Sequence, residues 1–353
     1  MKDNKKVCIA TVSVFSSNNC GSFLQAYCLK KTIEKRYGVQ AFFLDAHRRL
    51  KFSKAIRECL YNIKHRNFHA FLIRYKAYFL YRKLYNREKY KTIELINRNP
   101  DEYRIILGSD EIWNVNDQYT FSVPYFFGMG FMSKEISSYA TSMNTAELKD
   151  FQKSEQGKSY LESIAKIGHI SVRDSHTKFE IEQIPNVKAT LVLDPTFFCF
   201  SNNSKFYNRE RKRYIFLYCF WNFTDEFIDE LKRFAEKNDL LIIGANKRQN
   251  PMQKHVGNSP KLFLSYMRNA DYIITDTFHG AAFSIIFNKN FVYMPSAKRK
   301  VHELIGTFHL ENRKYADGNL SDNFSKTIDY TKVNDIIEKE KKDSFDFLDS
   351  VFK

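Results

Sequence analysis

The chain has 353 residues, which is more than one ordinary hydrophobic core accommodates, so we expect two domains. Its apolar fraction of 43% and charged fraction of 27% are typical of a globular protein, and no run of apolar residues is long enough for a membrane span. The first fifteen residues do not have the pattern of a secretory signal, so we expect none, and the six scattered cysteines form no CxxC pair. We therefore expect reduced thiols in the cytoplasm and no metal site.

Most of the net charge of +16 lies in one segment. Residues 47–91 contain fourteen Lys and Arg residues and two Glu residues, a net charge of +12. Aromatic residues recur there at helical spacing, from Phe68 to Phe79, which predicts an amphipathic helical insertion. Such a helix fits an anionic membrane surface, and an ordinary solvated helix is the alternative. Because no nucleic-acid-binding motif accompanies the charge, we expect no nucleic acid partner.

The first half of the chain predicts strands alternating with helices. Gly38 ends the first helix, and residues 18–21 (NNCG) form the loop before it. Polar turns are expected at 108–114 (GSDEIWN) and 141–144. Strands are expected over 7–15, 39–44, 103–107, 136–140, 167–173 and 191–193, and helices over 22–37 and 158–165.

The second half is more regular and follows an irregular run at 200–213. Strands are expected over 213–220, 239–243, 271–275 and 290–294, and helices over 224–237, 260–269, 280–287 and from Val333. Alternation of this kind indicates a parallel sheet covered by helices on both faces, and so an α/β protein. We predict one domain over 1–190, which includes the basic insertion, a second over 205–325, and a C-terminal helix within 326–353.

The stretch DYIITDTFHGAAFSIIF (271–287) is a buried strand and a buried helix joined by a short turn. Ligands of open α/β sheets bind beside such turns, and a helix N-terminus suits an anionic group. His279 lies in this turn, where an imidazole could donate a proton to a bound anion. Alternatively, Asp276 or Thr277 caps the helix and His279 is a structural residue bonded to the backbone. The residues alone leave both readings open.

Five short motifs occur in order along the chain: NNCGSFLQAYCL (18–29), GSDEIWN (108–114), SVRD (171–174), LDPTF (193–197) and TDTFHGAAFSI (275–285). With these motifs the chain resembles the polysaccharide pyruvyl transferase family, as far as about Arg313. A weaker pattern of Arg299, Leu304, Leu310 and Arg313 follows the last strand. The basic insertion lies outside the resemblance.

The resemblance implies two Rossmann-like domains facing a cleft, as in GT-B enzymes. It also implies a transferase that moves a pyruvyl group from phosphoenolpyruvate, its donor substrate, onto two hydroxyls of a sugar in a surface or capsular polysaccharide precursor. The product is a cyclic ketal, and neither a cofactor nor a metal is needed. We expect a lipid-linked acceptor and a cytoplasmic enzyme that is peripheral at the inner face of the membrane.

The candidate catalytic residues have separate roles. His279 is the acid, Asp110 is the base for a sugar hydroxyl, and Arg173 could fork onto the donor's carboxylate or phosphate. The alternatives are an ion-pair network of Arg173 with Asp174 and a helix cap by Asp110. The residues predicted to bind substrate lie in the turns after the strands and nearby: Asn19, Gly21, Gln25, Ser109, Asn114, Ser142, Thr277, Gly280 and Arg299.

One position departs from the family pattern. Better-studied branches carry arginine two residues before the histidine, where this chain has Thr277. Arg299, Lys298 or Arg313 could replace that cation, or the donor could differ.

Two other functions are weighed against this one. A nucleotide-sugar glycosyltransferase on the same fold would need a ribose-binding carboxylate and a base platform, for which Glu303 and Phe291 are available. A non-catalytic membrane-associated scaffold is the third reading, and the intact His279, Arg173 and Asp110 argue against it.

Overall fold

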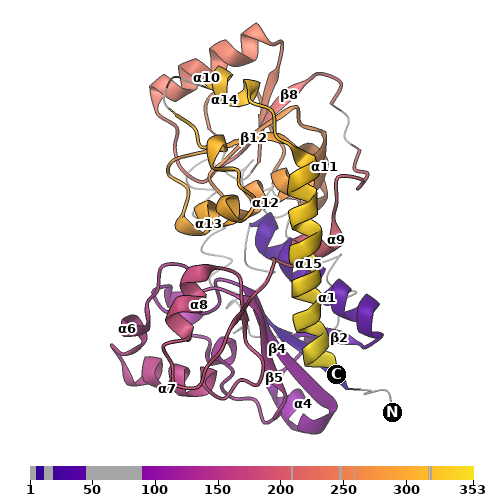
Figure 1. Ribbon diagram of the computed structural model, residues 1–353, viewed down its shortest axis with the longest axis vertical. Coiled ribbons are helices and arrows are strands. Elements are labelled where there is room, and N and C mark those ends of the chain that lie inside the picture. Colours follow the sequence, from indigo (N-terminus) through magenta and orange to yellow (C-terminus); the bar gives the residue numbers. More distant parts are fainter. Residues whose placement is uncertain are drawn as a thin grey trace, which may run out of the picture. The chain divides into compact units, whose positions relative to one another are not determined.

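The computed structural model describes residues 5–11, 19–44, 90–207, 210–245, 249–257, 259–316, 318 and 320–353. The chain divides into two compact units. Unit 1 comprises Met1–Ser17, Gln25–Pro195 and Ser344–Lys353, and unit 2 comprises Asn18–Leu24 and Thr196–Asp343. Each unit is built on a parallel sheet, so the predicted α/β class is confirmed (Figure 1).

In the described part of unit 1, seven strands form one sheet in the order β3-β2-β1-β4-β5-β6-β7. The order reverses where β1 pairs with β4, as in a Rossmann sheet, and ligands of such sheets bind at the carboxyl ends of the strands near this point. The apolar β-branched residues of β1 and β4 are buried on both faces because helices cover the sheet. The strands are β1 (Lys6–Ala10), β2 (Ala41–Leu44), β3 (Tyr90–Lys91), β4 (Tyr103–Asp110), β5 (Ile136–Thr141), β6 (Ser171–Val172) and β7 (Thr190–Leu191).

Several boundaries predicted in the first half of the chain are wrong. The strand predicted over 7–15 ends at Ala10, because Thr11 is no longer part of β1, and residues 12–15 lie outside the described part of the chain. The turn predicted at 108–114 begins later, because Gly108 and Asp110 still pair with β5. The strand predicted over 167–173 shortens to β6, since β5 pairs with it only at Val172 and the earlier contact of His169 is an isolated bridge. The first helix begins at Cys20, inside the predicted loop.

The predicted basic insertion at 47–91 is described only at its end. Residues 47–89 lie outside the described part of the chain, so the predicted amphipathic helix stays a prediction. Tyr90 and Lys91 are not helical: they form β3, which pairs in parallel with β2 at the edge of the sheet.

The helices of unit 1 follow the predicted alternation, with further short ones between strands. Helix α7 carries the helix predicted over 158–165, and Gly38 ends α1 with φ +68°, as expected for a glycine cap. The helices are α1 (Cys20–Tyr37, whose first residues belong to unit 2), α4 (Ile93–Asn97), α5 (Gln118–Phe121), α6 (Leu148–Phe151), α7 (Glu155–Ile164) and α8 (Ser175–Ile181), with 3₁₀ turns at Pro100–Glu102 and Pro124–Phe127.

Among the described residues of unit 2, five strands form a sheet in the order β10-β9-β8-β11-β12, which repeats the Rossmann order. The four predicted strands are confirmed with shifted ends, and β10 is additional. The strands are β8 (Tyr214–Tyr218), β9 (Leu241–Gly244), β10 (Lys254–His255), β11 (Tyr272–Thr275) and β12 (Asn290–Tyr293). Because β8 and β11 are central neighbours, the turns that follow them lie at the same edge of the sheet.

The predicted helices of unit 2 are confirmed, and helix α10 illustrates why they form. Thr224 caps its first turn, and Phe227, Leu231 and Phe234 recur on its buried face. Helix α14 lies beside it (Figure 1). The helices are α9 (Thr196–Cys199), α10 (Asp225–Lys237), α11 (Pro260–Asn269), α12 (Phe278–Ile286), α13 (Arg299–Thr307) and α14 (Leu320–Ser325), with a 3₁₀ turn at Glu311–Arg313.

Helix α15 (Tyr330–Phe352) begins among the residues of unit 2 and ends among those of unit 1. Its last turns are held by the end of α1. Arg36 binds both carboxylate oxygens of Asp349, at 2.8 and 2.7 Å, and the Tyr37 hydroxyl donates to the same carboxylate at 2.6 Å. The Tyr37 ring stacks on Phe352 with centroids 4.0 Å apart. Within the described residues, no helix is both long and apolar enough to cross a bilayer.

Candidate active site

The turn between β11 and α12 in unit 2 puts the predicted catalytic histidine in the first turn of a buried helix. Thr277 is the N-cap of α12, and its hydroxyl oxygen accepts a hydrogen bond of 2.9 Å from the Gly280 amide. His279 is only 5% exposed. The cap by Thr277 is therefore confirmed, and it gives Thr277 and Gly280 a structural role, while a hydrogen bond of His279 to the backbone stays a prediction.

The start of helix α1 lies directly against the His279 ring. Asn19 caps α1 by accepting a hydrogen bond of 2.9 Å from the Gly21 amide. A Cβ atom added at Gly21 would lie 2.2 Å from Nδ1 and 2.3 Å from Cγ of His279, so this approach requires glycine. Two helix N-termini, each with a partial positive charge, therefore meet at one imidazole. The structure thus brings Asn19, Gly21 and Gly280 together with His279.

Side chains of the sheet hold this arrangement. The Tyr218 hydroxyl donates to Asn19 Oδ1 at 3.3 Å, and burial raises the pKa of Tyr218 well above its usual value, so it stays a neutral donor. Asp276 accepts hydrogen bonds from the amides of Phe220 and Trp221, at 3.0 and 2.9 Å. Burial raises the pKa of Asp276, while the two amides act against this by stabilising the charged carboxylate.

Arg173, in unit 1, is the centre of a buried ion-pair network. It follows β6, and its guanidinium contacts Asp110 at the end of β4 (3.2 Å) and Asp194 after β7 (3.1 Å). The Arg173 side chain is 1% exposed. Burial lowers its pKa, but the negative charges of Asp110 and Asp194 outweigh this and raise it, so Arg173 is a permanent cation. One guanidinium thus lies between two carboxylates.

The ion-pair network weighed as the alternative for Arg173 is present, but its direct partners are Asp110 and Asp194 instead of Asp174. Asp174 caps α8 by accepting from the amide and hydroxyl of Thr177, at 2.8 and 2.6 Å, while the ion pairs of Arg173 go to Asp110 and Asp194. Asp110 ends a strand and has φ +80°, a left-handed conformation that costs a non-glycine residue about 1–3 kcal/mol and clusters at functional sites.

Two predicted substrate-binding side chains of unit 1 contact each other. The Ser109 hydroxyl donates to Gln25 Oε1, and Gln25 Nε2 donates to the Thr11 hydroxyl at 3.3 Å. Both Ser109 and Gln25 are fully buried. They therefore tie α1 to the ends of β1 and β4 in this structure, which is a positioning role.

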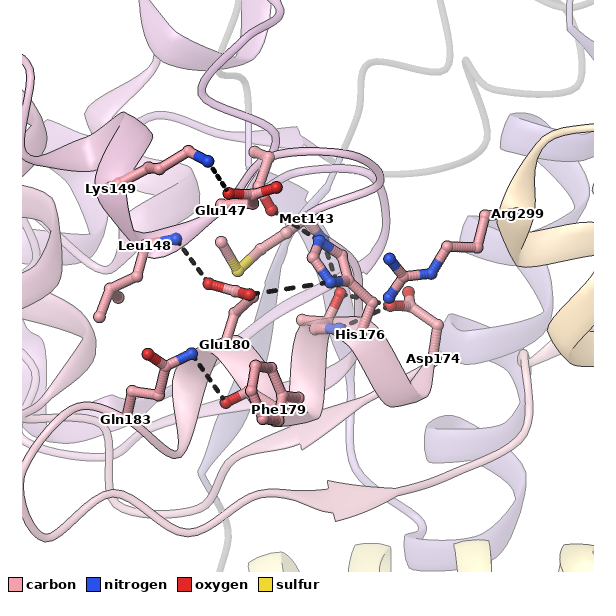
Figure 2. A network of polar contacts seen from close by, with 12 residues as sticks. Met143, Glu147, Leu148, Lys149, Asp174, His176, Phe179, Glu180, Gln183 and Arg299 are labelled. Carbon is pink, nitrogen blue, oxygen red and sulfur yellow. Dashed lines mark hydrogen bonds and ion pairs between the residues drawn. The ribbon is translucent and has the colours of Figure 1, made fainter.

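Helix α8 braces the turn after β5, which contains Ser142 (Figure 2). The Met143 amide donates to the Thr177 hydroxyl at 2.9 Å, and Glu180 accepts from the Leu148 amide at 2.7 Å. His176 Nε2 lies 2.8 Å from the Ala146 carbonyl oxygen, which can only accept, so this nitrogen carries the proton.

Ser142 and Asn114 lie within this same edge of unit 1. The Ser142 hydroxyl accepts from the Asn144 amide at 3.0 Å, and Asn114 Oδ1 accepts from the Asn116 amide at 3.2 Å. Both side chains are buried. Each therefore shapes its own turn, and their predicted contact with substrate stays a prediction.

The cations considered as substitutes for the missing arginine differ in their environments. Arg313 is fully buried and donates to the carbonyl oxygens of Phe291 and Lys326 and to Asn290, at 2.8, 3.0 and 2.7 Å. It is therefore a structural residue.

The remaining cations lie at the start of α13. Arg299 pairs with Glu303 at 2.9 Å, and Lys298 is the N-cap residue. Lys300, which the sequence did not single out, has its ammonium 5.7 Å from the centre of the Phe278 ring. Phe278 immediately precedes His279, so Lys300 brings a positive charge to the same turn.

Besides Lys300, two acidic residues of these sites were missed by the sequence reasoning. Asp194 was part of the LDPTF motif, and its place directly after a predicted strand was the signal that could have identified it. Asp276 was considered only as a helix cap, and its actual partners follow β8, more than fifty residues earlier in the chain.

Comparison with known proteins agrees with this architecture. Among solved structures, similar folds include a UDP-N-acetylglucosamine 2-epimerase, with 7% identity over 99% of this chain and 95% of that one and a TM-score of 0.57. The putative UDP-N-acetylglucosamine 2-epimerase from Listeria monocytogenes is 10% identical over 96% and 90% of the chains, with a TM-score of 0.54. At such identities the likeness concerns the fold alone, and it confirms two Rossmann-like domains of the GT-B kind.

A search of curated protein sequences finds no match. The family described as polysaccharide pyruvyl transferase, however, matches residues 19–297, which include the five motifs except for the first residue of NNCGSFLQAYCL, and the turns described above. The match covers most of the chain. The chain therefore belongs to the polysaccharide pyruvyl transferase family and is a transferase.

Proposed function

We propose that this enzyme transfers a pyruvyl group from phosphoenolpyruvate to two hydroxyls of a sugar in a precursor of a surface or capsular polysaccharide. The family match supports a pyruvyl group and a saccharide acceptor. The observation that carries the proposal is the meeting of the α1 and α12 N-termini at the His279 ring. Phosphoenolpyruvate is a small polyanion, and two helix N-termini favour such a ligand beside a proton donor.

The reaction needs one proton donor and one base. His279 protonates the methylene carbon of phosphoenolpyruvate, which leaves C2 electron-poor, and a sugar hydroxyl oxygen then bonds to C2. The bond from C2 to the phosphate oxygen breaks, phosphate departs, and the second hydroxyl oxygen bonds to C2 to close the ketal. Of the two hydroxyl protons, one replaces the proton that His279 gave, and the other leaves with phosphate. Asp110 is the proposed acceptor of a hydroxyl proton.

Arg173 acts on this chemistry through Asp110. Its ion pairs with Asp110 and Asp194 favour ionised carboxylates, and a base must be ionised to accept a proton. Lys300 is the proposed replacement for the arginine that related enzymes carry at the position of Thr277, because its ammonium lies beside Phe278. A direct fork of Arg173 onto the donor stays a prediction.

The decisive assay combines the protein with phosphoenolpyruvate and a panel of lipid-linked and simple glycosides. Phosphate release together with the mass gain of one pyruvyl ketal is the expected result. In deuterated water the ketal methyl group should carry one deuterium, because the methylene carbon takes a solvent-exchanged proton. Release of a nucleotide from a sugar nucleotide, without phosphate from phosphoenolpyruvate, would instead identify a glycosyltransferase.

His279→Asn separates the acid role from a structural one. Asparagine keeps a polar group of similar reach but cannot protonate carbon, so turnover should fall roughly a hundred- to ten-thousandfold while donor affinity is largely kept. Turnover near that of the wild type would remove His279 from the mechanism.

We also propose that the basic segment at 47–91 brings the enzyme to an anionic membrane that carries a lipid-linked acceptor. The support is its net charge of +12, since each basic residue near such a surface contributes on the order of 1 kcal/mol, screened by salt. Pelleting with vesicles that contain acidic lipid should weaken steeply with salt and vanish with neutral vesicles. Vesicle binding that does not change with salt concentration would contradict the proposal.

A further inference from the structure

Phe220 and Trp221 form an exposed aromatic pair in the loop after β8. They are 47% and 60% exposed, although the preceding strand is fully buried. The Phe220 ring leans edge-on against the buried Tyr218 ring, with centroids 6.2 Å apart and planes at 63°. Large aromatic side chains are mostly buried, so two exposed neighbours in one loop indicate a surface that contacts something else.

The backbone beneath these rings is fixed. The buried Asp276 carboxylate accepts hydrogen bonds from the amides of both Phe220 and Trp221. Charge-assisted bonds of this kind are about twice as strong as neutral ones. The loop that carries the two exposed rings is therefore already ordered before a ligand binds, and this lowers the entropic cost of binding.

The pair also lies at the ligand-binding edge of the unit 2 sheet. Strands β8 and β11 are adjacent and parallel, so the loop after β8 and the turn after β11 emerge side by side. Asp276 lies in the turn after β11, and its carboxylate binds the amides of the loop after β8. His279 lies three residues after Asp276 in the chain. The exposed aromatic pair and the proposed acid His279 therefore belong to two neighbouring segments of unit 2 that Asp276 links.

We propose that Trp221, supported by Phe220, is a stacking platform for a pyranose ring of the acceptor saccharide. This inference rests on the proposed function. One face of a pyranose presents C–H groups whose positive edges match the negative face of an aromatic ring, and the hydroxyls around the sugar's rim stay free to react. The indole of Trp221 is the largest flat surface that any side chain offers to such a sugar face. A saccharide is the expected occupant because the family is that of the polysaccharide pyruvyl transferases.

Intrinsic fluorescence can test this directly, because the chain contains two tryptophans in opposite environments. Trp113 is fully buried and its indole donates to the Phe126 carbonyl at 2.8 Å, whereas Trp221 is exposed. Titration with methyl pyranosides of glucose, galactose, mannose and N-acetylglucosamine should shift the emission to shorter wavelength and protect it from iodide quenching. Trp221→Phe should lose this response.

Steady-state kinetics give the second readout. Trp221→Ala should raise KM for the acceptor about tenfold, while KM for phosphoenolpyruvate and Tm stay unchanged. Trp221→Phe keeps an aromatic ring at this position, so its KM for the acceptor should stay close to that of the wild type. Tyr207→Ala is the matched control, because this tyrosine is 83% exposed in the irregular run of unit 2. It should behave as the wild type.

The possible outcomes separate the two proposals. No fluorescence response to any glycoside, together with an unchanged KM in Trp221→Ala, would overturn the platform even if pyruvyl transfer is found. A response to uridine monophosphate but to no glycoside would identify a nucleotide surface and also overturn it. Saturable, Trp221-dependent glycoside binding without pyruvyl transfer would keep the platform and refute the proposed reaction.

Discussion

Gly21→Ala tests the close approach of α1 to His279 with one carbon atom. The added methyl group would lie 2.2 Å from Nδ1 and 2.3 Å from Cγ, and ordinary contact begins at about 3.4 Å. The ring must therefore move by about 1.2 Å, or α1 must move by the same amount. A displacement of about 1 Å in a catalytic group costs on the order of a hundredfold in rate, so we expect kcat to fall by about that factor.

The folded state should tolerate the substitution better than the reaction does. Overpacking costs about 1–3 kcal/mol, but alanine gains up to about 1 kcal/mol over glycine within a helix, so the net loss should be about 0–2 kcal/mol. Gly38→Ala is the control, at the residue that ends the same helix: Gly38 has φ +68°, and nothing lies within 4 Å of the added atom. It should lower stability by about 1–2 kcal/mol and leave kcat unchanged.

Phosphate release gives kcat, and a double-mutant cycle identifies the cause. If the methyl group acts by displacing the imidazole, Gly21→Ala should have little further effect on an enzyme that already carries His279→Asn. A full hundredfold loss in that background would show that the damage lies elsewhere. Wild-type kcat in Gly21→Ala itself would refute both the contact and the role of the ring.

Three further predictions concern charges. Arg173→Met should lower the free energy of unfolding by about 3–5 kcal/mol, because it strands two buried carboxylates, and adding Asp110→Asn should recover part of the loss in chemical denaturation. The ion pair with Arg36 lowers the pKa of Asp349 to about 2. This pair should stabilise the folded state by about 1 kcal/mol after solvent screening, fully above pH 4 and progressively less as the pH falls towards 2. In thermal unfolding, Asp349→Asn should show a weaker dependence of Tm on acidic pH than the wild type. Lys300→Met should raise KM for phosphoenolpyruvate about tenfold with little change in Tm, and an unchanged KM would exclude it as the donor's cation.

The regular elements of unit 2 could be predicted because each carries its own local signal. Pro260 stands at the first position of helix α11, and Thr224 and Thr277 stand where helix caps belong. The end of β4 could not be predicted in this way. Gly108 to Asp110 look like a turn by composition, yet the backbone of a strand can pair with its neighbour whatever its side chains are.

The candidate sites could be predicted only as separate turns. The motif residues His279, Arg173 and Asp110 were found because each follows a predicted strand within a motif of the family. The residues that contact them could not be predicted. Gly21 contacts His279 but is more than 250 residues away in the chain, and Asp194 contacts Arg173 only because β7 pairs with β6. Contacts of this kind follow from strand order, which local patterns do not encode.

The path of helix α15 has a consequence for how the protein is made. Residues 344–353 belong to unit 1 but are synthesised after the whole of unit 2. Until they emerge from the ribosome, the Leu193 amide lacks the Ser344 hydroxyl that it bonds at 2.9 Å, and Arg36 and Tyr37 lack Asp349. Domains generally fold in the order of their synthesis, but here the unit whose synthesis begins first is the one completed last.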